Sequence, residues 1–428
     1  MLRYDAVIFD LDGTLTNSEK GITTCAAYAL QKMGKPVPDL QGLRKYIGPP
    51  LAESFPLYAG MNAEETEQAV KYYRERYLPI GWRENMVYPG IRSLLKTLKE
   101  KGAQVFVATG KPLAPSERIL RYFDLMRYID GVAGPTEEEP YGGKEQLIGR
   151  VLQGKTYKKA VMIGDRASDI EGALAYGIDG IAAGYGFGEE NEFDGLNCRF
   201  VGSVEELALA LTDEPLRRKG YFISIEGLDG CGKTTQSDAV EAALRDFGYR
   251  VVRTREPGGC PISEKIRDLL LDVSNVGMSG IAEALLYAAS RAQHVHQVIR
   301  PAVERGDVVL CDRFVDSSVA FQGGGRELGV DLIQRINQPA VEGCLPDTTV
   351  FLKLDHETAL RRRKNASALD RIESEEASFH ARVEQAYDTL VEREPERFIA
   401  VDAKEKPEEI TEKILAALFA RMDAAEVV

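Results

Sequence analysis

The sequence is poor in the residues that build metal centres and disulfide frameworks. Its 428 residues include six cysteines and four histidines, and no two cysteines form a CxxC pair. No histidine stands at ligand spacing from a cysteine, so neither a zinc site nor a disulfide framework is expected. We expect free, mostly buried thiols at the six positions, which are Cys25, Cys198, Cys231, Cys260, Cys311 and Cys344.

Long apolar runs and an excess of positive charge are also missing. The run IAEALLYAA at 281–289, one of the longest, is far too short to cross a bilayer. Near the N-terminus, Asp5, Asp10 and Asp12 interrupt what would have to be the apolar core of a signal peptide. The net charge of −13 argues against a nucleic-acid partner. We therefore expect a cytoplasmic protein that binds neither membranes nor nucleic acid.

What the sequence does contain is a repeated α/β pattern. Its length predicts at least two hydrophobic cores. Short β-branched runs alternate with helical patterns, which predicts parallel sheets with crossover helices. We expect four strands in the first half and five in the second, at 4–10, 103–110, 159–165, 180–184, 221–227, 249–256, 307–313, 348–355 and 397–403.

The boundary between the two halves is expected near residue 216. A closing helix followed by a polar stretch with Pro and Gly predicts domains at 1–212 and 220–428, joined by a linker at 213–219. The helical segment 17–82 precedes the second strand and is large enough to cap a pocket. The predicted fold class is α/β, with two three-layer, parallel-sheet domains of which the first carries a helical cap.

In the first half, polar residues follow successive predicted strands. Asp10 and Asp12 come at the end of the first strand, where residues i and i+2 share a face. Carboxylates crowded into one crevice repel each other unless a cation neutralises them, which implies Mg²⁺. A lone aspartate of this kind is usually a cap or turn residue. The complete ordered series instead predicts a ligand site at the carboxyl edge of the sheet, made of Asp10, Asp12, Thr109, Lys144 (in the loop YGGKEQ), Asp165 and Asp169.

This series resembles the haloacid dehalogenase-like phosphohydrolase superfamily over residues 3–211. The resemblance implies that Asp10 attacks phosphorus and forms an aspartyl-phosphate. It implies that Asp12 protonates the leaving oxygen and later activates water. Thr109 and Lys144 would hold the phosphoryl oxygens, with Lys144 also offsetting the charge between Asp10 and the substrate.

The same resemblance implies a magnesium site and a cap that selects the substrate. Asp165, assisted by Asp169, would bind Mg²⁺ together with Asp10 and the main-chain carbonyl of Asp12. The stretch IGPPLAESF at 47–55 and the helical insert resemble the phosphoglycolate phosphatase and 5′-nucleotidase branch. The substrate of this half stays open, as a small phosphate ester or a nucleotide.

The second half carries a phosphate-binding loop. The stretch GLDGCGKT satisfies GxxxxGK[ST], with a strand before it and a helix-forming stretch after it. Backbone N–H groups and the helix N-terminus would face the phosphates of ATP. Lys233 is expected to reach the β- and γ-phosphates and Thr234 to bind Mg²⁺, while Cys231 substitutes for a small residue. The other predicted nucleotide-binding residues are Gly227, Leu228, Asp229, Gly230 and Gly232.

Further charged residues follow the neighbouring strands. Asp312 is expected to orient the waters of magnesium and Arg313 to clamp a phosphate between donor and acceptor. Arg255 and Glu256 stand at another strand end. The run LRRRK at 360–364 clusters four positive charges, and a kinase needs mobile cations that close over the transferred phosphoryl group.

Together these motifs closely resemble the thymidylate kinase family over residues 220 to about 420. The stretches that carry the resemblance are IEGLDGCGKTTQ, TREPGG, EALLYAASRAQHV, DRFVDSSVAFQGGGR and LDRIE. The resemblance implies transfer of the ATP γ-phosphate to dTMP, giving dTDP, in a nucleoside monophosphate kinase fold with a lid at about 360–373. It also implies a homodimer formed through helices of the kinase core.

The resemblance assigns the sugar and phosphate side of the acceptor site to Asp229, Arg313 and Phe321. Asp229 would bind the deoxyribose 3′-hydroxyl and help organise the metal, and Arg313 would hold the acceptor phosphate. Arg255 is expected to contribute to substrate binding. The bulk of Phe321 would exclude a 2′-hydroxyl, although core packing is an alternative role for this ring.

Three further residues fall on the base side. Tyr287 would stack on thymine, although core packing is an alternative here too. Arg291 would hydrogen-bond O4 of the base, and Ser318 would meet the edge of the base.

The source of the catalytic lid cation is left open among several residues. Gly230 stands where some relatives carry arginine, which suggests the subtype whose lid supplies that cation. The lid positives are concentrated at 361–364, and a neutral stretch follows. The candidates are Lys364, Arg371, Arg362 and Arg363, of which the last two are assigned to catalysis.

The two halves would run opposite chemistry, since one adds a phosphoryl group and the other removes one. A hydrolase that accepted dTMP would waste ATP, so we expect the first half to act on another ester, such as a non-canonical nucleotide or phosphoglycolate. One alternative makes 1–212 a non-catalytic scaffold that aids dimerisation of the kinase. Another makes the phosphatase the main activity and the kinase half the passenger.

Overall fold

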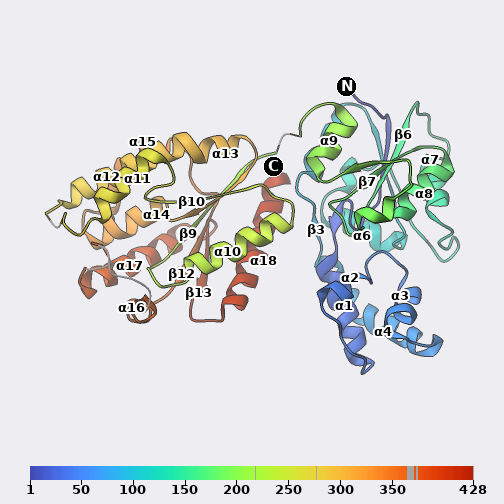
Figure 1. Cartoon of the computed structure of the whole chain (residues 1–428), viewed down its shortest axis with the longest axis horizontal. Helices are drawn as coiled ribbons and strands as arrows, with labels where there is room; N and C mark the ends of the chain where they lie inside the picture. Colours follow the sequence, from blue (N-terminus) through green and yellow to red (C-terminus); the bar gives the residue numbers. More distant parts are fainter. Residues whose placement is uncertain (217, 276, 364–370, 373–374, 428) are drawn as a thin grey trace. The chain divides into compact units, whose positions relative to one another are not determined.

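The computed structural model divides the chain into two compact units, Met1–Leu216 (unit 1) and Arg217–Val428 (unit 2) (Figure 1). It describes residues 1–427 apart from 217, 276, 364–370 and 373–374, and the side chains of 363, 426 and 427 are also outside the description. Each unit is described by itself.

Unit 1 is built on a six-stranded parallel sheet in the order β5-β4-β1-β6-β7-β8. The central strand β1 (Ala6–Phe9) pairs with β4 (Gln104–Ala108) on one side and with β6 (Ala160–Gly164) on the other. Four of these strands were predicted; β5 and β8, with three residues each, are too short to show a strand pattern. The remaining strands are β5 (Gly131–Ala133), β7 (Asp179–Ala183) and β8 (Arg199–Val201).

Helices cover both faces of this sheet because its side chains alternate between two cores. Val7 and Phe9 belong to one buried cluster, and Ala6 and Ile8 belong to the other. The first cluster includes residues of α5 (Ile91–Glu100), α6 (Leu113–Tyr122) and α9 (Val204–Thr212), and the second includes residues of α7 (Lys144–Leu152) and α8 (Ala167–Tyr176). Short 3-10 turns lie at Met126–Tyr128 and Glu190–Phe193.

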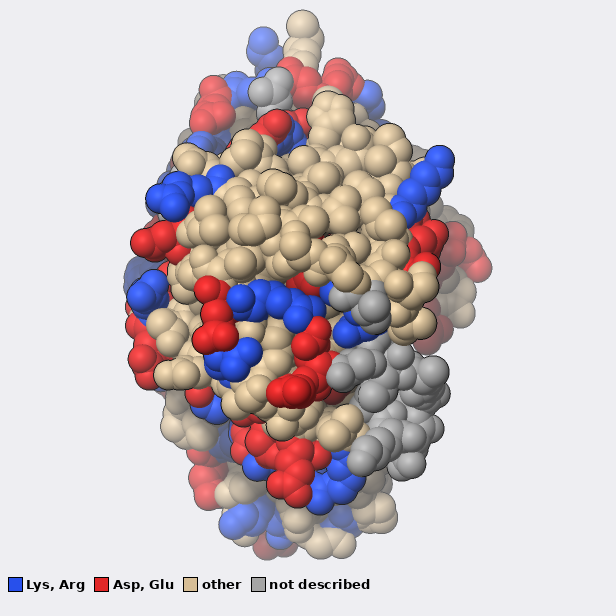
Figure 2. Space-filling view, turned by 90° about the vertical axis from the view of Figure 1, so that its left-hand side faces the viewer, with Lys and Arg blue, Asp and Glu red and all other residues tan. Residues whose placement is uncertain are grey.

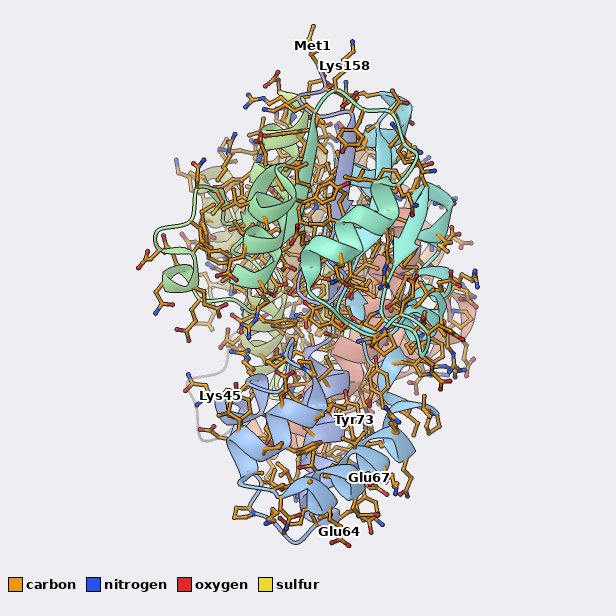
Figure 3. The ribbon with its side chains drawn as sticks, turned by 90° about the vertical axis from the view of Figure 1, so that its right-hand side faces the viewer. Met1, Lys45, Glu64, Glu67, Tyr73 and Lys158 are labelled. Carbon is orange, nitrogen blue, oxygen red and sulfur yellow. The ribbon has the colours of Figure 1, made fainter. Side chains whose placement is uncertain are left out.

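A helical cap is inserted between β1 and α5. Its base is an antiparallel ribbon of two short strands, β2 (Thr16–Asn17) and β3 (Met86–Val87). Figure 3 shows Tyr73 of the cap toward the sheet, with Glu64 and Glu67 at the far end of the same helix. The cap consists of α1 (Glu19–Lys32), α2 (Leu40–Arg44), α3 (Leu51–Ala59), α4 (Ala63–Tyr77) and the 3-10 turn η1 (Gly81–Arg83).

Unit 2 is built on a five-stranded parallel sheet in the order β10-β11-β9-β12-β13. All five strands were predicted from the sequence, so the α/β fold class is confirmed in both halves. Their bounds are β9 (Tyr221–Glu226), β10 (Val251–Arg255), β11 (Val308–Asp312), β12 (Thr348–Lys353) and β13 (Phe398–Asp402).

Two buried clusters again separate the layers of unit 2. Tyr221 and Ile223 of β9 pack in one cluster, and Phe222 between them packs in the other. Helices α10 (Lys233–Asp246), α17 (Ala377–Arg393) and α18 (Pro407–Val427) contribute to the first cluster. The other helical segments are α11 (Pro261–Leu271), α12 (Gly280–His294), the π-helical η4 (Val295–Ile299), α13 (Arg300–Glu304), α14 (Val315–Ser318), the π-helical η5 (Val319–Gly325), α15 (Val330–Val341) and α16 (His356–Arg363).

Among the described residues, no helix combines the length and the apolar character that crossing a bilayer requires.

Candidate active sites

In unit 1, the ends of three parallel strands place polar side chains at one edge of the sheet. Asp10 follows β1, Thr109 follows β4 and Asp165 follows β6, and all three are buried. Lys144 is the first residue of α7 rather than a loop residue as predicted, and Asp169 lies in the first turn of α8. The structure therefore brings together residues that are up to 159 positions apart in the sequence, from Asp10 to Asp169.

Three of these side chains form a compact carboxylate cluster. Oxygens of Asp10, Asp165 and Asp169 lie within 4.8 Å of one another. Their residues are 8%, 1% and 1% exposed, so water screens the charges little. Gly13 permits this closeness: it has φ +82°, and a Cβ at this position would lie 2.1 Å from Oδ2 of Asp165.

Lys144 lies between two of the carboxylates. Its Nζ is 3.1 Å from Oδ1 of Asp10 and 2.6 Å from Oδ1 of Asp169, and it donates to the carbonyl oxygen of Ala108 at 3.1 Å. Burial alone would lower the pKa of this ammonium group, but the two carboxylates raise it above its usual value. Lys144 is therefore a permanent positive charge beside Asp10.

The charges of the cluster fit a divalent cation. Burial, with the nearby charges of Asp169 and Asp12, raises the pKa of Asp10 to about 6 despite Lys144. Burial and the other two carboxylates also raise the pKa of Asp165. Three carboxylates face one ammonium group, so the cluster keeps an excess of negative charge. Asp10, Asp165 and Asp169 are thus a suitable oxygen donor set for Mg²⁺.

Asp12 lies apart from this cluster and has a different partner. Its Oδ2 accepts a hydrogen bond of 2.5 Å from Nζ of Lys111, a residue that the sequence patterns did not single out. The ammonium group of Lys111 also lies 5.4 Å from the centre of the Tyr77 ring on cap helix α4. Thr109 accepts from the backbone N–H of Lys111 at 3.2 Å, which ties the predicted phosphate-binding hydroxyl to the same turn.

In unit 2, the P-loop joins β9 to α10, as the motif predicted. Nζ of Lys233 donates to the carbonyl oxygens of Gly227 and Leu228 and to Oδ1 of Asp229, each at 3.2 Å. Thr234 is exposed at the start of α10, so its hydroxyl is accessible to a ligand. Burial raises the pKa of the Cys231 thiol, which agrees with a packing role rather than a nucleophilic one.

Arg313 links the P-loop to the loop that follows β11. Its Nη2 donates to Oδ1 of Asp229 at 2.7 Å. Burial alone would raise the pKa of Asp229, but Arg313 and Lys233 lower it below its usual range. Oδ1 of Asp312 is buried without a hydrogen-bond partner among the described residues, as expected for a group that binds something from solution.

A cavity of about 100 Å³ opens beside this ion pair. Six of the residues predicted for the acceptor site line it, namely Asp229, Tyr287, Arg291, Arg313, Ser318 and Phe321. Glu256, Arg267, Ser317 and Gln322 also line it and add polar groups that were not assigned to the substrate. Residues from separate motifs of the second half therefore line one pocket in the structure.

Arg291 is fixed in the wall of this cavity by its own hydrogen bonds. Nε donates to Glu256 at 2.7 Å, Nη2 to the carbonyl oxygen of Phe314 at 3.1 Å, and Nη1 to Ser318 at 3.1 Å and to Asn337. These bonds use four of the five N–H groups of the guanidinium. Within the described part of the chain, the fifth N–H has no recorded partner, and the other four bonds fix the orientation of the guanidinium.

Arg255 and Arg371 are held by partners that do not fit the roles predicted for them. Arg255 is exposed and pairs with Glu264 at 3.0 Å, and it does not line the described cavity. Arg371 is buried, pairs with Glu283 at 2.8 Å and donates to the carbonyl oxygen of Leu270. In this arrangement Arg371 attaches the end of the lid segment to α11 and α12, which makes it a poor candidate for a mobile cation.

Of the other candidates for the catalytic lid cation, the structure describes the side chain of Arg362. Arg362 donates to the carbonyl oxygen of Ala403 at 2.9 Å, beside the loop between β13 and α18. The side chain of Arg363 and the whole of Lys364 lie outside the described residues. A second cavity, of about 330 Å³, borders the P-loop at Leu228 and reaches Lys404.

Comparison with known proteins agrees with this division of the chain. A family model for thymidylate kinase matches residues 225–414, and one for haloacid dehalogenase-like hydrolase matches residues 7–183. The thymidylate kinase of Limosilactobacillus fermentum is 50% identical over 205 residues, which cover 47% of this chain and 96% of that protein. The thymidylate kinase of Pelobacter propionicus is 48% identical over 206 residues, with 47% and 94% covered.

Solved structures also match about half of the chain. A protein from Clostridium acetobutylicum described as a predicted phosphatase is 40% identical, with a TM-score of 0.45, and the match covers 48% of this chain and 97% of that one. A haloacid dehalogenase-like hydrolase from Streptococcus pneumoniae is 30% identical, with a TM-score of 0.45 and coverage of 48% and 98%.

The P-loop and the lined cavity on a parallel sheet define unit 2 as a phosphotransferase that uses a nucleoside triphosphate, and the strand-end aspartates define unit 1 as a phosphohydrolase-type domain. The chain belongs to the thymidylate kinase family through unit 2, and unit 1 is a haloacid dehalogenase-like hydrolase domain.

Proposed function

We propose that unit 2 transfers the γ-phosphate of ATP to dTMP and so supplies dTDP for dTTP synthesis. The observation that carries the proposal is the Asp229–Arg313 pair, because it joins the P-loop to the acceptor cavity at 2.7 Å. A phosphate held by Arg313 would lie beside the γ-phosphate held by Lys233, which is the proximity that phosphoryl transfer needs. Mg²⁺ would supply charge neutralisation through the Thr234 hydroxyl and waters oriented by Asp312.

The cavity supports an acceptor with a planar base. Tyr287 and Phe321 provide apolar faces, while the orientation of Arg291 presents one N–H to an exocyclic oxygen. The sugar would approach Phe321, whose ring packs against Phe379 and Tyr387 and therefore has little freedom to yield to an extra hydroxyl. These features favour a thymine deoxyribonucleotide over a ribonucleotide.

The kinase proposal is tested by measuring ADP formation with ATP, Mg²⁺ and either dTMP or a ribonucleotide such as UMP. We expect turnover with dTMP, little turnover with UMP, and loss of both in Lys233→Ala. Absence of dTDP formation by the wild-type protein would contradict the proposal.

We further propose that unit 1 hydrolyses a phosphate ester other than dTMP through an aspartyl-phosphate. Asp10 would form the bond to phosphorus while the ester oxygen leaves with a proton from Asp12. Water would then attack the acyl phosphate, giving its proton back to Asp12 and releasing inorganic phosphate. The position of Lys144 supports attack by Asp10, because its positive charge reduces the repulsion between the Asp10 carboxylate and the dianionic phosphoryl group.

The substrate of unit 1 is proposed to be a small phosphate ester, such as phosphoglycolate, or a non-canonical nucleotide. Hydrolysis of an aryl phosphate by the Lys233→Ala protein, lost in a second variant that adds Asp10→Asn, would establish the activity and contradict a purely scaffolding role. A panel of monophosphates would then rank the substrates. Preferential hydrolysis of dTMP would contradict the division of labour proposed here.

Unit 2 is also proposed to form a homodimer through α11 and α12. These helices pack against each other, and both carry large apolar side chains exposed to solvent. Ile281 and Leu285 are one helical turn apart on α12, and Ile262 and Leu269 lie two turns apart on α11. Figure 2 shows a broad surface without charged side chains on the end of unit 2 that carries these helices. A second copy of the chain would bury this face.

A further inference from the structure

The last residue of β9 is a fully buried glutamate that does not line either described cavity of unit 2. Glu226 is 0% exposed. Its Oε1 accepts from the backbone N–H of Phe314 at 2.7 Å, and its Oε2 accepts from the hydroxyls of Ser317 at 2.6 Å and Tyr387 at 2.9 Å. The Glu226 carboxylate therefore fixes the loop after β11 through hydrogen bonds to Phe314 and Ser317.

That loop contains a strained residue. Arg313 has φ +67°, a left-handed conformation that costs energy for a residue with a side chain. Its own backbone N–H donates to the carbonyl oxygen of Ile225 at 3.0 Å, one residue before Glu226. The strained turn is thus held on both sides, at Arg313 by β9 itself and at Phe314 by the Glu226 carboxylate.

A chain of hydrogen bonds leads from the glutamate to the acceptor cavity. The Ser317 hydroxyl donates to Glu226 and accepts from Nη1 of Arg313 at 3.2 Å. Nη2 of the same guanidinium donates to Asp229 at 2.7 Å. The fork of Arg313 is therefore oriented from two directions, with one partner buried behind the cavity and the other on the P-loop.

We propose that Glu226 is a positioning residue for the kinase, which orients the Arg313 guanidinium toward the acceptor phosphate through the loop Arg313–Ser317. It is fully buried and lines neither described cavity, so its influence on the reaction would pass through the Phe314 N–H and the Ser317 hydroxyl. The inference rests on the proposed transfer to dTMP, in which Arg313 holds the acceptor phosphate.

The charges around Glu226 support a functional reason for its retention. Asp316 faces it with like charge, Arg313 with opposite charge, and the Tyr387 phenol and the Cys311 thiol lie close by. Burial, together with Asp316, raises the pKa of Glu226 to about 7, against the pull of Arg313. A buried carboxylate with a raised pKa weakens the fold at neutral pH, so stability alone does not explain its presence.

Glu226→Gln tests the proposal because it keeps the shape of the side chain and removes the charge. We expect the KM for dTMP to rise about ten- to hundredfold, the range for loss of a hydrogen bond to a charged group, while the KM for ATP stays close to wild type. The melting temperature at pH 8 should not fall. Ser317→Ala, which removes the bridging hydroxyl and keeps the buried carboxylate itself, should reproduce the dTMP effect and should add little when combined with Glu226→Gln.

Asp307→Asn is the matched control. Asp307 is also a buried carboxylate of unit 2, but it lies before β11, at the opposite edge of the sheet, where it pairs with Arg250 and Arg305. The control should leave the KM for dTMP unchanged. Equal losses for both nucleotides together with a lower melting temperature, or an unchanged KM for dTMP in both Glu226→Gln and Ser317→Ala, would overturn the proposal. If the wild-type protein fails to phosphorylate dTMP, the result would instead contradict the kinase function on which the Glu226 proposal rests.

Discussion

Lys111 and Asp12 form a largely buried ion pair at the border of the core and the cap of unit 1. The two groups are 2.5 Å apart, and their side chains are 11% and 13% exposed. Burial alone would lower the pKa of Lys111, but Asp12 and then Tyr77 of the cap raise it. The proposed acid and base of the phosphatase is therefore held by a lysine whose surroundings come partly from the cap.

Replacing Lys111 by Met should impair the phosphatase without unfolding unit 1. The Asp12 carboxylate would lose the lysine that holds it in place and balances its charge, so its proton transfer should slow. We expect kcat for aryl phosphate hydrolysis to fall about tenfold or more. Lys99→Met, which removes a lysine paired with Asp130 at the other edge of the sheet, is the control and should leave kcat unchanged. A Lys111→Met protein with wild-type kcat would show that the pair has no part in catalysis.

Magnesium should stabilise unit 1 more at pH 7.5 than at pH 5. The pKa of Asp10 is raised from its usual 3.8 to about 6, so without metal the cluster contributes stability below pH 4 that is lost as the pH rises through 6. A divalent ion removes this penalty only where the carboxylates are ionised. Melting curves in EDTA and in Mg²⁺ at both pH values measure the difference, and Asp165→Asn should reduce it. The same Mg²⁺ shift at both pH values would contradict the assignment of the metal to this cluster.

The pH dependence of the stability of unit 2 should report Glu226. Its pKa of about 7 lies above the ordinary 4.5, so its contribution to stability is full below pH 4.5 and is lost as the pH rises through 7. In Glu226→Gln this loss should disappear, so the variant should melt above wild type at pH 8 and closer to it at pH 5. Each kcal/mol gained corresponds to about 2–4 °C for a domain of this size. A variant that melts below wild type at pH 8 would mean that the carboxylate stabilises the fold when ionised.

The strand-end residues of both sites could be predicted because their positions follow from chain order. Parallel strands bring their carboxyl ends to one edge, so Asp10, Thr109 and Asp165 meet whatever connects them. The P-loop is likewise a local pattern with its own geometry. Tyr287 and Arg291 follow a different rule, since their helical spacing places both on the face of α12 that lines the cavity.

The residues that sequence reasoning missed depend on contacts between distant segments. Lys111 looks like a solvent-exposed lysine until Tyr77 and Asp12 enclose it. Glu226 ends an apolar strand, and its partners Phe314 and Tyr387 are 88 and 161 positions away. Arg371 belongs to the lid motif, yet Glu283 of α12 holds it. No local period encodes such pairs, so only the fold reveals them.

The apolar face of α11 and α12 should hold two copies of the chain together. Leu285→Glu would place a charge within it, and burying an unpaired carboxylate costs several kcal/mol, enough to dissociate an interface of ordinary size. We expect light scattering to give twice the 47.3 kDa chain mass for wild type and a single chain mass for the variant. Leu345→Glu, at an exposed leucine outside these helices, should remain dimeric. Because α12 also carries Tyr287 and Arg291, dissociation should raise the KM for dTMP more than the KM for ATP. Wild-type protein with the mass of one chain, or a Leu285→Glu protein that stays dimeric, would contradict this assignment of the face.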